Sequence, residues 1–311
     1  MSPATHTLQH TAPARFGFAV WLQAIRPKTL SAGAVPVFIG TGLAYGRGAG
    51  KLLPALAALS GALLIQIGTN LANDYYDFKR GADTSERLGP VRVTQSGLIA
   101  PSTVLAGASL AFAAAFIVGL YLVAAGGWPI AALGVLSLLS GFAYTGGPAP
   151  LAYLGLGDLF VLLFFGFGAV GGTYFVQAGN LIPAVALAAV PAGALGTAIL
   201  VVNNLRDEAT DAKAGKRTLV VRWGARAGQI EYCVMLATAF AAPLVLWTMG
   251  MARGSVLLSW LSAPLVLPPL SRVLNQKGAA LNPALGATAR LQLAFGLLFA
   301  AGLYLSGGEG P

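Results

Sequence analysis

Long apolar stretches without any charged residue alternate with short polar loops along the chain. A helix needs about 17–25 mainly apolar residues to cross a bilayer. Five of the stretches have the length of one such helix, and the two longest have room for two helices each. The stretches of at least 18 residues are 29–46, 52–73, 93–157, 159–205, 232–252, 254–271 and 291–308.

The two longest stretches each contain a break near the middle, GGWP at 126–129 and QAGN at 177–180. Glycine and proline clusters interrupt helices, so the pattern predicts an all-α membrane protein with nine transmembrane helices. The amphipathic segment 16–28 predicts a short helix lying in the membrane interface. We expect a tail and interfacial helix at 1–28, one transmembrane domain at 29–306 and a tail at 307–311. The predicted spans are 29–46, 52–74, 101–124, 129–145, 155–176, 182–204, 231–250, 254–272 and 288–306.

The composition excludes whole classes of protein. Charged residues make up 9% of the 311-residue chain and hydrophobic ones 56%, whereas soluble domains carry about 25% charge. Such a chain cannot cover a soluble surface, which excludes a soluble enzyme, a nucleic-acid-binding domain and a disordered protein. The net charge of +9 therefore indicates loops that face an anionic membrane surface.

The basic residues predict the orientation in the membrane. With nine spans, sixteen of the 19 Lys and Arg residues fall on one side, leaving Arg47, Lys51 and Arg253 on the other. Cytoplasmic loops carry the excess of positive charge, so the richer side is predicted to be cytoplasmic. We expect an integral protein of the bacterial inner membrane.

Seven of the ten acidic residues gather in two loops on that same side, and each group extends a polar helix face. Gln66, Asn70, Asn73 and Asp77 follow one another at steps of four, three and four, and Asn203, Asp207 and Asp211 at steps of four. Residues four apart share a helix face, about 5–6 Å from each other. Polar groups inside a membrane are costly unless they line a cavity or face the bundle interior, which favours a functional site over solvated loops.

Carboxylates and amides converging at one membrane face point to a hard cation. Mg²⁺ prefers oxygen ligands and is usually held by one or two carboxylates together with water and phosphates. The only cysteine is Cys233 and both histidines lie in the N-terminal tail, which argues against zinc. Interleaved lysines and arginines supply phosphate donors. The pattern therefore predicts a clamp for the diphosphate of a lipid whose tail lies among the helices.

Several segments resemble the UbiA superfamily of membrane aromatic prenyltransferases. The segments NLANDYYDFKRGADT (70–84) with GPVRVTQSGLI (89–99), and NNLRDEATDAKAGKRTL (203–219), are similar to its two aspartate-rich motifs. The branch that prenylates 1,4-dihydroxy-2-naphthoate is the most similar, on the evidence of RPKTL (26–30), YTGGPAPLAYLGLGDL (144–159), GGTYFVQ (171–177) and LNPALGATARL (281–291). The first motif departs from the superfamily's NDxxDxxxD spacing, because Gly81 stands where a third acid would fall and Asp83 follows.

The resemblance implies a helical bundle around a central cavity, a polyprenyl diphosphate donor, Mg²⁺ and 1,4-dihydroxy-2-naphthoate as acceptor, with loss of CO₂ to give demethylmenaquinol. Three alternatives stay open: another aromatic acceptor, a cation-coupled transporter, and a scaffold whose loops recruit partners. A transporter usually places its acids near the midplane, whereas these lie at one rim.

The expected site residues fall into three groups, each with a plainer alternative. Asp158 is expected to position or deprotonate the acceptor, or else to cap a helix. Asp74 is expected to bind metal, or else to cap a helix or pair with Arg80. The cations are expected to bind substrate, or else to anchor the chain to lipid headgroups. The predicted metal ligands are Asn73, Asp74, Asp77, Asp83, Asn203, Asp207 and Asp211, with Asp77, Asp207 and Asp158 as catalytic residues and Arg80, Arg87, Lys216, Arg217, Arg26, Lys28 and Tyr144 as substrate-binding residues.

Overall fold

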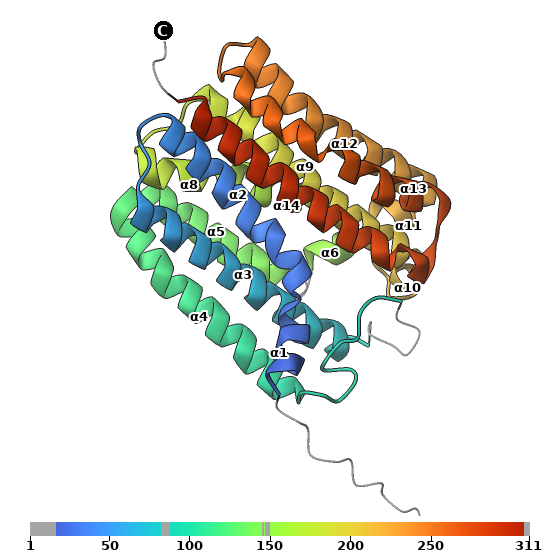
Figure 1. The fold of residues 1–311 in the computed structure, drawn as a ribbon. Helices are drawn as coiled ribbons and strands as arrows, with labels where there is room; N and C mark the ends of the chain where they lie inside the picture. Colours follow the sequence, from blue (N-terminus) through green and yellow to red (C-terminus); the bar gives the residue numbers. More distant parts are fainter. Residues whose placement is uncertain (1–16, 82–87, 145, 147–149, 308–311) are drawn as a thin grey trace, which may run out of the picture.

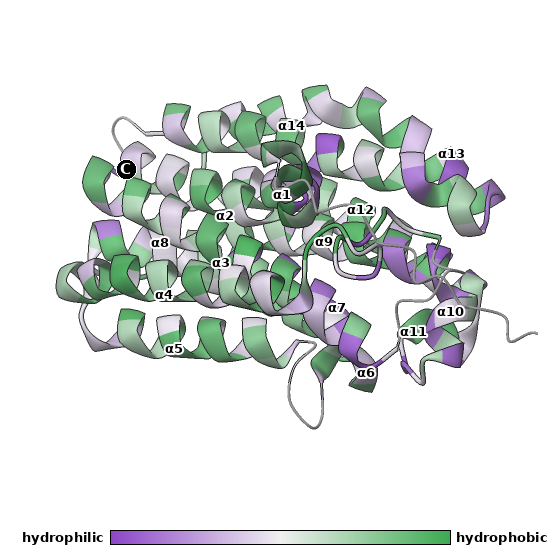
Figure 2. Ribbon diagram, turned by 90° about the horizontal axis from the view of Figure 1, so that it is seen from below, coloured by the Kyte–Doolittle hydropathy of each residue, from purple (hydrophilic) through white to green (hydrophobic). Residues whose placement is uncertain are grey.

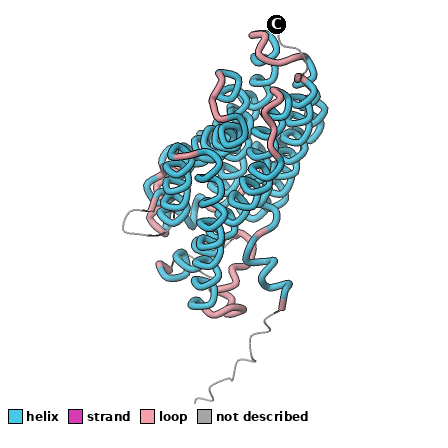
Figure 3. Tube along the Cα trace, turned by 90° about the vertical axis from the view of Figure 1, so that its left-hand side faces the viewer, coloured by secondary structure: helices cyan, strands magenta, loops and turns pink. Residues whose placement is uncertain are grey.

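The computed structural model describes residues 17–81, 88–144, 146 and 150–307, and every regular element within these ranges is a helix (Figure 3). The elements are α1 (Phe18–Ile25), α2 (Pro27–Gly46), α3 (Leu52–Lys79), α4 (Pro101–Gly126), α5 (Trp128–Ala143), α6 (Leu151–Leu154), α7 (Gly157–Val161), η1 (Leu162–Gly168), α8 (Ala169–Ala178), α9 (Pro183–Arg206), α10 (Glu208–Lys213), α11 (Leu219–Trp223), α12 (Ala225–Thr248), η2 (Gly254–Val266), α13 (Leu267–Asn275), η3 (Gly278–Leu281) and α14 (Asn282–Leu305).

Within the described ranges, eight helical segments are long and apolar enough to cross a membrane. α5 occupies the place of the remaining predicted span and is apolar, but it has only 16 residues, fewer than the roughly 20 that a crossing usually takes. The all-helical fold is confirmed, and the count of nine crossings stays a prediction.

Both breaks predicted inside the long apolar stretches are helix boundaries. Gly127 separates α4 from α5 with a φ of +72°, and Gly179 separates α8 from α9 with a φ of +79°. Only glycine adopts such backbone angles without steric cost. α12 begins at Ala225 and α14 at Asn282, earlier than the predicted starts at 231 and 288. The charge of Arg226 explains the first difference only, since the span predicted from 288 already includes Arg290. Arg226 and Arg290 both lie inside these helices.

Two spans contain irregular helix that the apolar pattern did not predict. The fifth predicted span, 155–176, includes the π-helical turn η1, and the eighth predicted span, 254–272, begins with the 3₁₀ segment η2. Along η2 the buried residues Val256, Ser259 and Ser262 recur every third position, and each serine hydroxyl donates to the carbonyl three residues earlier. A 3₁₀ helix has three residues per turn, so this repeat puts one buried stripe along its length.

α9 is the central helix of the bundle, and 78% of its most apolar 18-residue stretch is buried. It packs against α12, η1, α2 and α14, and α14 in turn lies along α2 and η2 (Figure 1). Small residues permit these close approaches: a Cβ at Gly193 of α9 would meet the Leu162 carbonyl oxygen at 2.6 Å. This half of the molecule holds the larger apolar core.

α3, α4 and α5 form a thinner wall on the other side of the bundle (Figure 1). In the corresponding 18-residue apolar stretches, only 22% is buried in α3 and 17% in α4. The C-terminal end of α3, together with α6, α7, α10 and α11, lies at one end of the bundle, where hydrophilic residues gather (Figure 2). Asn282 of α14 ties in the loop after α3 by donating to the Leu88 carbonyl at 2.8 Å.

Candidate active site

A single cavity of about 610 Å³ receives the polar ends of α3 and α9 and continues between apolar helices. Both aspartate-rich segments contribute to its lining, although they are 130 residues apart in the sequence. The predicted metal ligands that line it are Asn73, Asp77, Asn203, Asp207 and Asp211. The structure thus brings the two segments to one site, as a shared diphosphate clamp requires.

Of the two described acids of the first segment, Asp74 and Asp77, only Asp77 lines the cavity. It lies in the last turn of α3, is 4% exposed, and accepts a hydrogen bond from Arg92 Nη2 through Oδ2 at 3.0 Å. Its second oxygen, Oδ1, is buried and has no hydrogen-bond partner among the described residues. A buried carboxylate oxygen without a protein partner is a place where a bound ion or water is expected.

Asp207 ends α9 and is paired with its own neighbour in the sequence. Arg206 donates to it twice, from Nε to Oδ1 at 2.8 Å and from Nη2 to Oδ2 at 2.6 Å. Its third nitrogen, Nη1, donates to Asn282 Oδ1 at 3.2 Å. Arg206 is only 4% exposed, and two parallel bonds to one carboxylate fix its orientation.

Asp211 and Lys216 form the third ion pair of the cavity, with Nζ 3.0 Å from Oδ1. Burial raises the pKa of Asp211 above its usual range, while the charge of Lys216 opposes that rise. Burial alone lowers the pKa of Lys216, but the charges of Asp77 and Asp211 outweigh it, and the pKa lies above the ordinary lysine value. Lys216 is therefore a permanent cation in this site.

Asp74 does not line the cavity. It is 1% exposed, and its carboxylate accepts the backbone N–H groups of Val93 at 3.3 Å and Thr94 at 3.1 Å. These bonds hold the loop that carries Arg92 against α3, so Asp74 supports the site from behind. Asp74 therefore neither caps a helix nor pairs with Arg80, which were the two alternatives to metal binding.

The predicted cations divide by position. Arg26 and Lys216 line the cavity, whereas Lys28, Arg80 and Arg217 are exposed and lie outside its lining. The Arg80 guanidinium lies 5.2 Å and Lys216 Nζ lies 5.4 Å from the centre of the Tyr153 ring. Asp83 and Arg87 fall outside the described residues, and their expected roles remain predictions.

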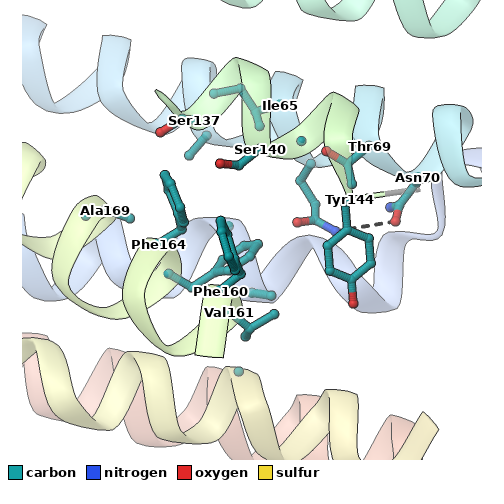
Figure 4. A pocket seen from close by; sticks show the side chains of 18 of the residues that line it. Ile65, Thr69, Asn70, Ser137, Ser140, Tyr144, Phe160, Val161, Phe164 and Ala169 are labelled. Carbon is teal, nitrogen blue, oxygen red and sulfur yellow. Dashed lines mark hydrogen bonds between the residues drawn. The ribbon is translucent and has the colours of Figure 1, made fainter. Parts of the chain in front are cut away.

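Tyr144 and Asp158 lie in the cavity next to the aspartate-rich segments. Asp158 Oδ1 accepts a hydrogen bond from Asn204 Nδ2 at 3.3 Å. The Tyr144 ring projects into the cavity beside Thr69 (Figure 4). The Tyr144 hydroxyl can donate and accept hydrogen bonds.

The polar stripe of α3 fixes an unusual backbone turn. Asn70 Nδ2 donates to the Ile25 carbonyl at 2.8 Å and to Thr29 Oγ1 at 3.0 Å, and Gln66 donates to Asn70 Oδ1 (Figure 4). Between these partners lies Arg26, whose φ of +52° is the one positive value among the described non-glycine residues. Such strain persists only where the surroundings impose it and often marks a functional site.

Apolar and aromatic side chains line the deeper part of the cavity. Phe160 and Phe164 stack with their ring centres 5.6 Å apart, and both project into the cavity from the fifth span (Figure 4). Phe164 lies in the π-helical turn η1, and such turns are frequent at functional sites. This lining excludes water from whatever the cavity holds.

Three lining residues, Arg92, Arg206 and Asn204, were not among the expected site residues. Each contacts an acid that the sequence did single out. Arg92 and Arg206 were expected only as members of a larger set, the basic residues that are interleaved with the acids as phosphate donors, and Asn204 directly follows Asn203 of the second motif. The available signal was their adjacency to the two motifs within otherwise apolar sequence.

The donor set fits Mg²⁺ better than it fits a preformed metal cluster. No group of three or more His, Cys, Asp or Glu side chains converges within the described part of the chain. The cavity instead offers separate carboxylate and amide oxygens, including the unpartnered Oδ1 of Asp77. One or two carboxylates with water and phosphate oxygens complete the usual coordination of Mg²⁺.

Comparisons with known proteins agree with this geometry. The model of the UbiA prenyltransferase family matches residues 34–285. The chain is 38% identical to the 1,4-dihydroxy-2-naphthoate octaprenyltransferase of Escherichia coli, over 92% of this chain and 95% of that one. It is 36% identical to the enzyme of the same name from Haemophilus influenzae, over 92% and 96%. A UbiA homolog from Archaeoglobus fulgidus bound to DMAPP and Mg²⁺ has a similar fold, with a TM-score of 0.60 at 16% identity over 90% and 98%.

Proposed function

We propose that this chain, which belongs to the UbiA prenyltransferase family, transfers a polyprenyl group from its diphosphate to 1,4-dihydroxy-2-naphthoate, with loss of CO₂, to give demethylmenaquinol. The observation that carries the proposal is that the cavity joins both aspartate-rich segments to a long apolar space. Relatives that this chain matches over nearly their whole length are named for that acceptor.

The residues of the ion pairs at the cavity rim would bind the diphosphate of the donor. Asn73, Asp77, Asn203, Asp207 and Asp211 would hold Mg²⁺, which when bound supplies the positive charge that stabilises the leaving diphosphate. The cations Arg92, Arg206 and Lys216 now contact those same acids. We infer that they turn to phosphate oxygens when the acids take up metal, so that no buried charge is left unpaired.

The acceptor end belongs to Arg26, Asp158 and Tyr144. Arg26 offers a guanidinium for the naphthoate carboxylate, a pairing suited to two parallel hydrogen bonds. Asp158 accepts the proton of a ring hydroxyl, and Asn204 holds its carboxylate in place. Tyr144 donates a hydrogen bond to the second ring oxygen. The ring carbon that carries the carboxylate then bonds to the allylic carbon as that carbon releases diphosphate. The carboxylate leaves as CO₂, the electrons of its bond restore the aromatic ring, and Asp158 returns its proton to the ring oxygen.

The helices around the cavity set where this happens. The excess of basic residues at the diphosphate end supports a cytoplasmic position for that end, and we expect the protein in the bacterial inner membrane. The apolar lining keeps water away from the allylic cation, which water would otherwise quench.

The proposal is tested with purified protein in lipid, a polyprenyl diphosphate, Mg²⁺ and a panel of aromatic acids. We expect a prenylated, decarboxylated product from 1,4-dihydroxy-2-naphthoate, identified by mass, and none from 4-hydroxybenzoate. EDTA should abolish turnover and added Mg²⁺ should restore it. Full turnover in EDTA contradicts the metal assignment, and product from another acid alone contradicts the acceptor.

A further inference from the structure

A glutamine amide is buried within the membrane-spanning part of α14. Gln292 is fully buried, and its Oε1 accepts a hydrogen bond from Ser31 Oγ of α2 at 3.2 Å. Its Nε2 is also buried and has no hydrogen-bond partner among the described residues. A buried amide nitrogen without a protein partner is a place where a ligand or water is expected. A polar side chain inside a membrane is costly and often marks a functional site.

The unpartnered nitrogen faces the cavity through a gap left by a glycine. Gly196 of α9 lines the cavity, and a Cβ added there would lie 3.7 Å from Gln292 Nε2. No side chain at this position therefore stands between the amide and the cavity. Gln292 itself lies behind the lining, so a ligand would meet its N–H group at Gly196.

This gap lies one helix turn from the hydroxyl of Tyr144. A Cβ at Gly157 of α7 would meet both Tyr144 Oη at 3.1 Å and Leu200 of α9 at 3.2 Å. One turn further along both helices, a Cβ at Gly196 would meet Val161 Cγ1 at 3.3 Å. Residues four apart on a helix are about 5–6 Å from each other. The hydroxyl and the amide therefore reach the cavity at neighbouring levels, and one ligand atom between them can contact both.

We propose that Gln292 determines acceptor specificity: its N–H group, reached past Gly196, donates a hydrogen bond to the second ring oxygen, from the side opposite Tyr144. This inference rests on the proposed prenyl transfer to 1,4-dihydroxy-2-naphthoate and adds how the second ring oxygen is recognised. An oxygen midway between donors about 5–6 Å apart lies within hydrogen-bond distance of both, and a hydroxyl oxygen has two lone pairs to accept them. An aromatic acid without this oxygen leaves the buried N–H unpaired, and sites of this kind discriminate against such analogues.

The test compares two naphthoates in binding and in turnover. Gln292→Met keeps the length of the side chain and removes the N–H donor. We expect Kd and KM for 1,4-dihydroxy-2-naphthoate to rise about five- to tenfold, the effect of one lost hydrogen bond, and KM for the polyprenyl diphosphate to stay unchanged. Kd for 1-hydroxy-2-naphthoate, which lacks the second hydroxyl, should be the same in the variant and the unaltered protein. An equal rise in Kd for both acids, or no rise for either, would overturn the proposal.

A second variant closes the gap and leaves Gln292 in place. Gly196→Ala puts a methyl group between the amide and the cavity, in ordinary contact with Nε2. It should raise Kd for the dihydroxy acid as Gln292→Met does. The double variant should show no further rise, because both changes remove the same contact and contacting residues are not additive. Additive effects of the two changes would overturn the contact past Gly196.

The matched control is Thr288→Val, one turn before Gln292 on α14. Thr288 is fully buried, shares a hydrogen bond of 2.9 Å with Tyr232 and lies outside the cavity lining. The change also removes a buried hydrogen bond from α14, yet Kd for both acids should stay unchanged. A higher Kd for the dihydroxy acid in this control would show that the effect of Gln292→Met is structural and would overturn the proposal. Should the unaltered protein bind the dihydroxy acid and form no product, the proposed transfer fails, and the Kd comparison still decides the role of Gln292.

Discussion

Asp77 and Asp207 each pair with an arginine that also lines the cavity, Arg92 and Arg206 respectively. Each carboxylate therefore balances a buried positive charge in addition to any role toward metal. Replacing an aspartate by asparagine keeps an acceptor for the arginine and removes the negative charge, which separates the two roles.

We expect Asp77→Asn and Asp207→Asn each to lower turnover by about 10²- to 10³-fold, the usual cost of losing a major electrostatic contact in a reacting site. The double variant should lose far less than the product of the two, because groups that act on one leaving group are not additive. Rates of product formation at saturating Mg²⁺ check this. Near-normal turnover of Asp77→Asn in a normally inserted protein would refute the clamp.

Arg26 combines a strained backbone with a position in the cavity, and substitution can separate these features. Arg26→Ala and Arg26→Gly both remove the guanidinium, so both should raise KM for 1,4-dihydroxy-2-naphthoate and leave KM for the donor unchanged. Only glycine accepts a φ of +52° without strain, so the glycine variant should be the more stable by about 1 kcal/mol. Thermal unfolding in detergent measures the difference; equal stabilities would show that the turn is not strained.

At the scale of the helices, close contact and open space distinguish two otherwise similar glycines. A Cβ at Gly193 would meet the Leu162 carbonyl oxygen at 2.6 Å, whereas one at Gly134 would meet nothing within 4 Å. Gly193→Ala should therefore lower the unfolding temperature by forcing α9 away from η1. Gly134→Ala should leave it unchanged or raise it, since alanine favours a helix by up to about 1 kcal/mol. A stable Gly193→Ala variant would contradict the packing of α9.

The sequence predicted the helices well because a membrane allows few alternatives to them. It predicted the breaks at Gly127 and Gly179 because glycine there has a backbone reason. It missed η1 and η2, since an apolar residue pattern does not distinguish α from π or 3₁₀ helix when most faces contact lipid or other apolar side chains.

The sequence could predict those site residues that follow the spacing of one helix. The spacing of four placed Asp77 and Asp207 correctly on the cavity side. The partners of these acids depend on how loops fold back: Arg92 lies fifteen residues after Asp77, and Asp74 holds that loop through backbone N–H groups. Spacing along one helix contains no information about such contacts.

For the whole molecule, the positive charges predict which end faces the cytoplasm. Thr210 belongs to the acidic end and Lys51 to the opposite end of the bundle. With Cys233→Ala as background, Thr210→Cys should resist a membrane-impermeant maleimide added to intact cells, and Lys51→Cys should react. Both should react after the cells are opened. Labelling of Thr210→Cys from outside would invert the orientation.

The exposed side chains of α4 and α5 that line the cavity also bear on how the protein encounters its donor. Because exposed Phe116, Leu120 and Val135 border the cavity within the hydrocarbon depth, a long-tailed molecule can enter and leave without crossing water. The relevant concentration is then a mole fraction among lipids. In proteoliposomes, diluting a fixed amount of donor with more phospholipid should slow the initial rate, whereas adding buffer at a fixed lipid-to-donor ratio should not.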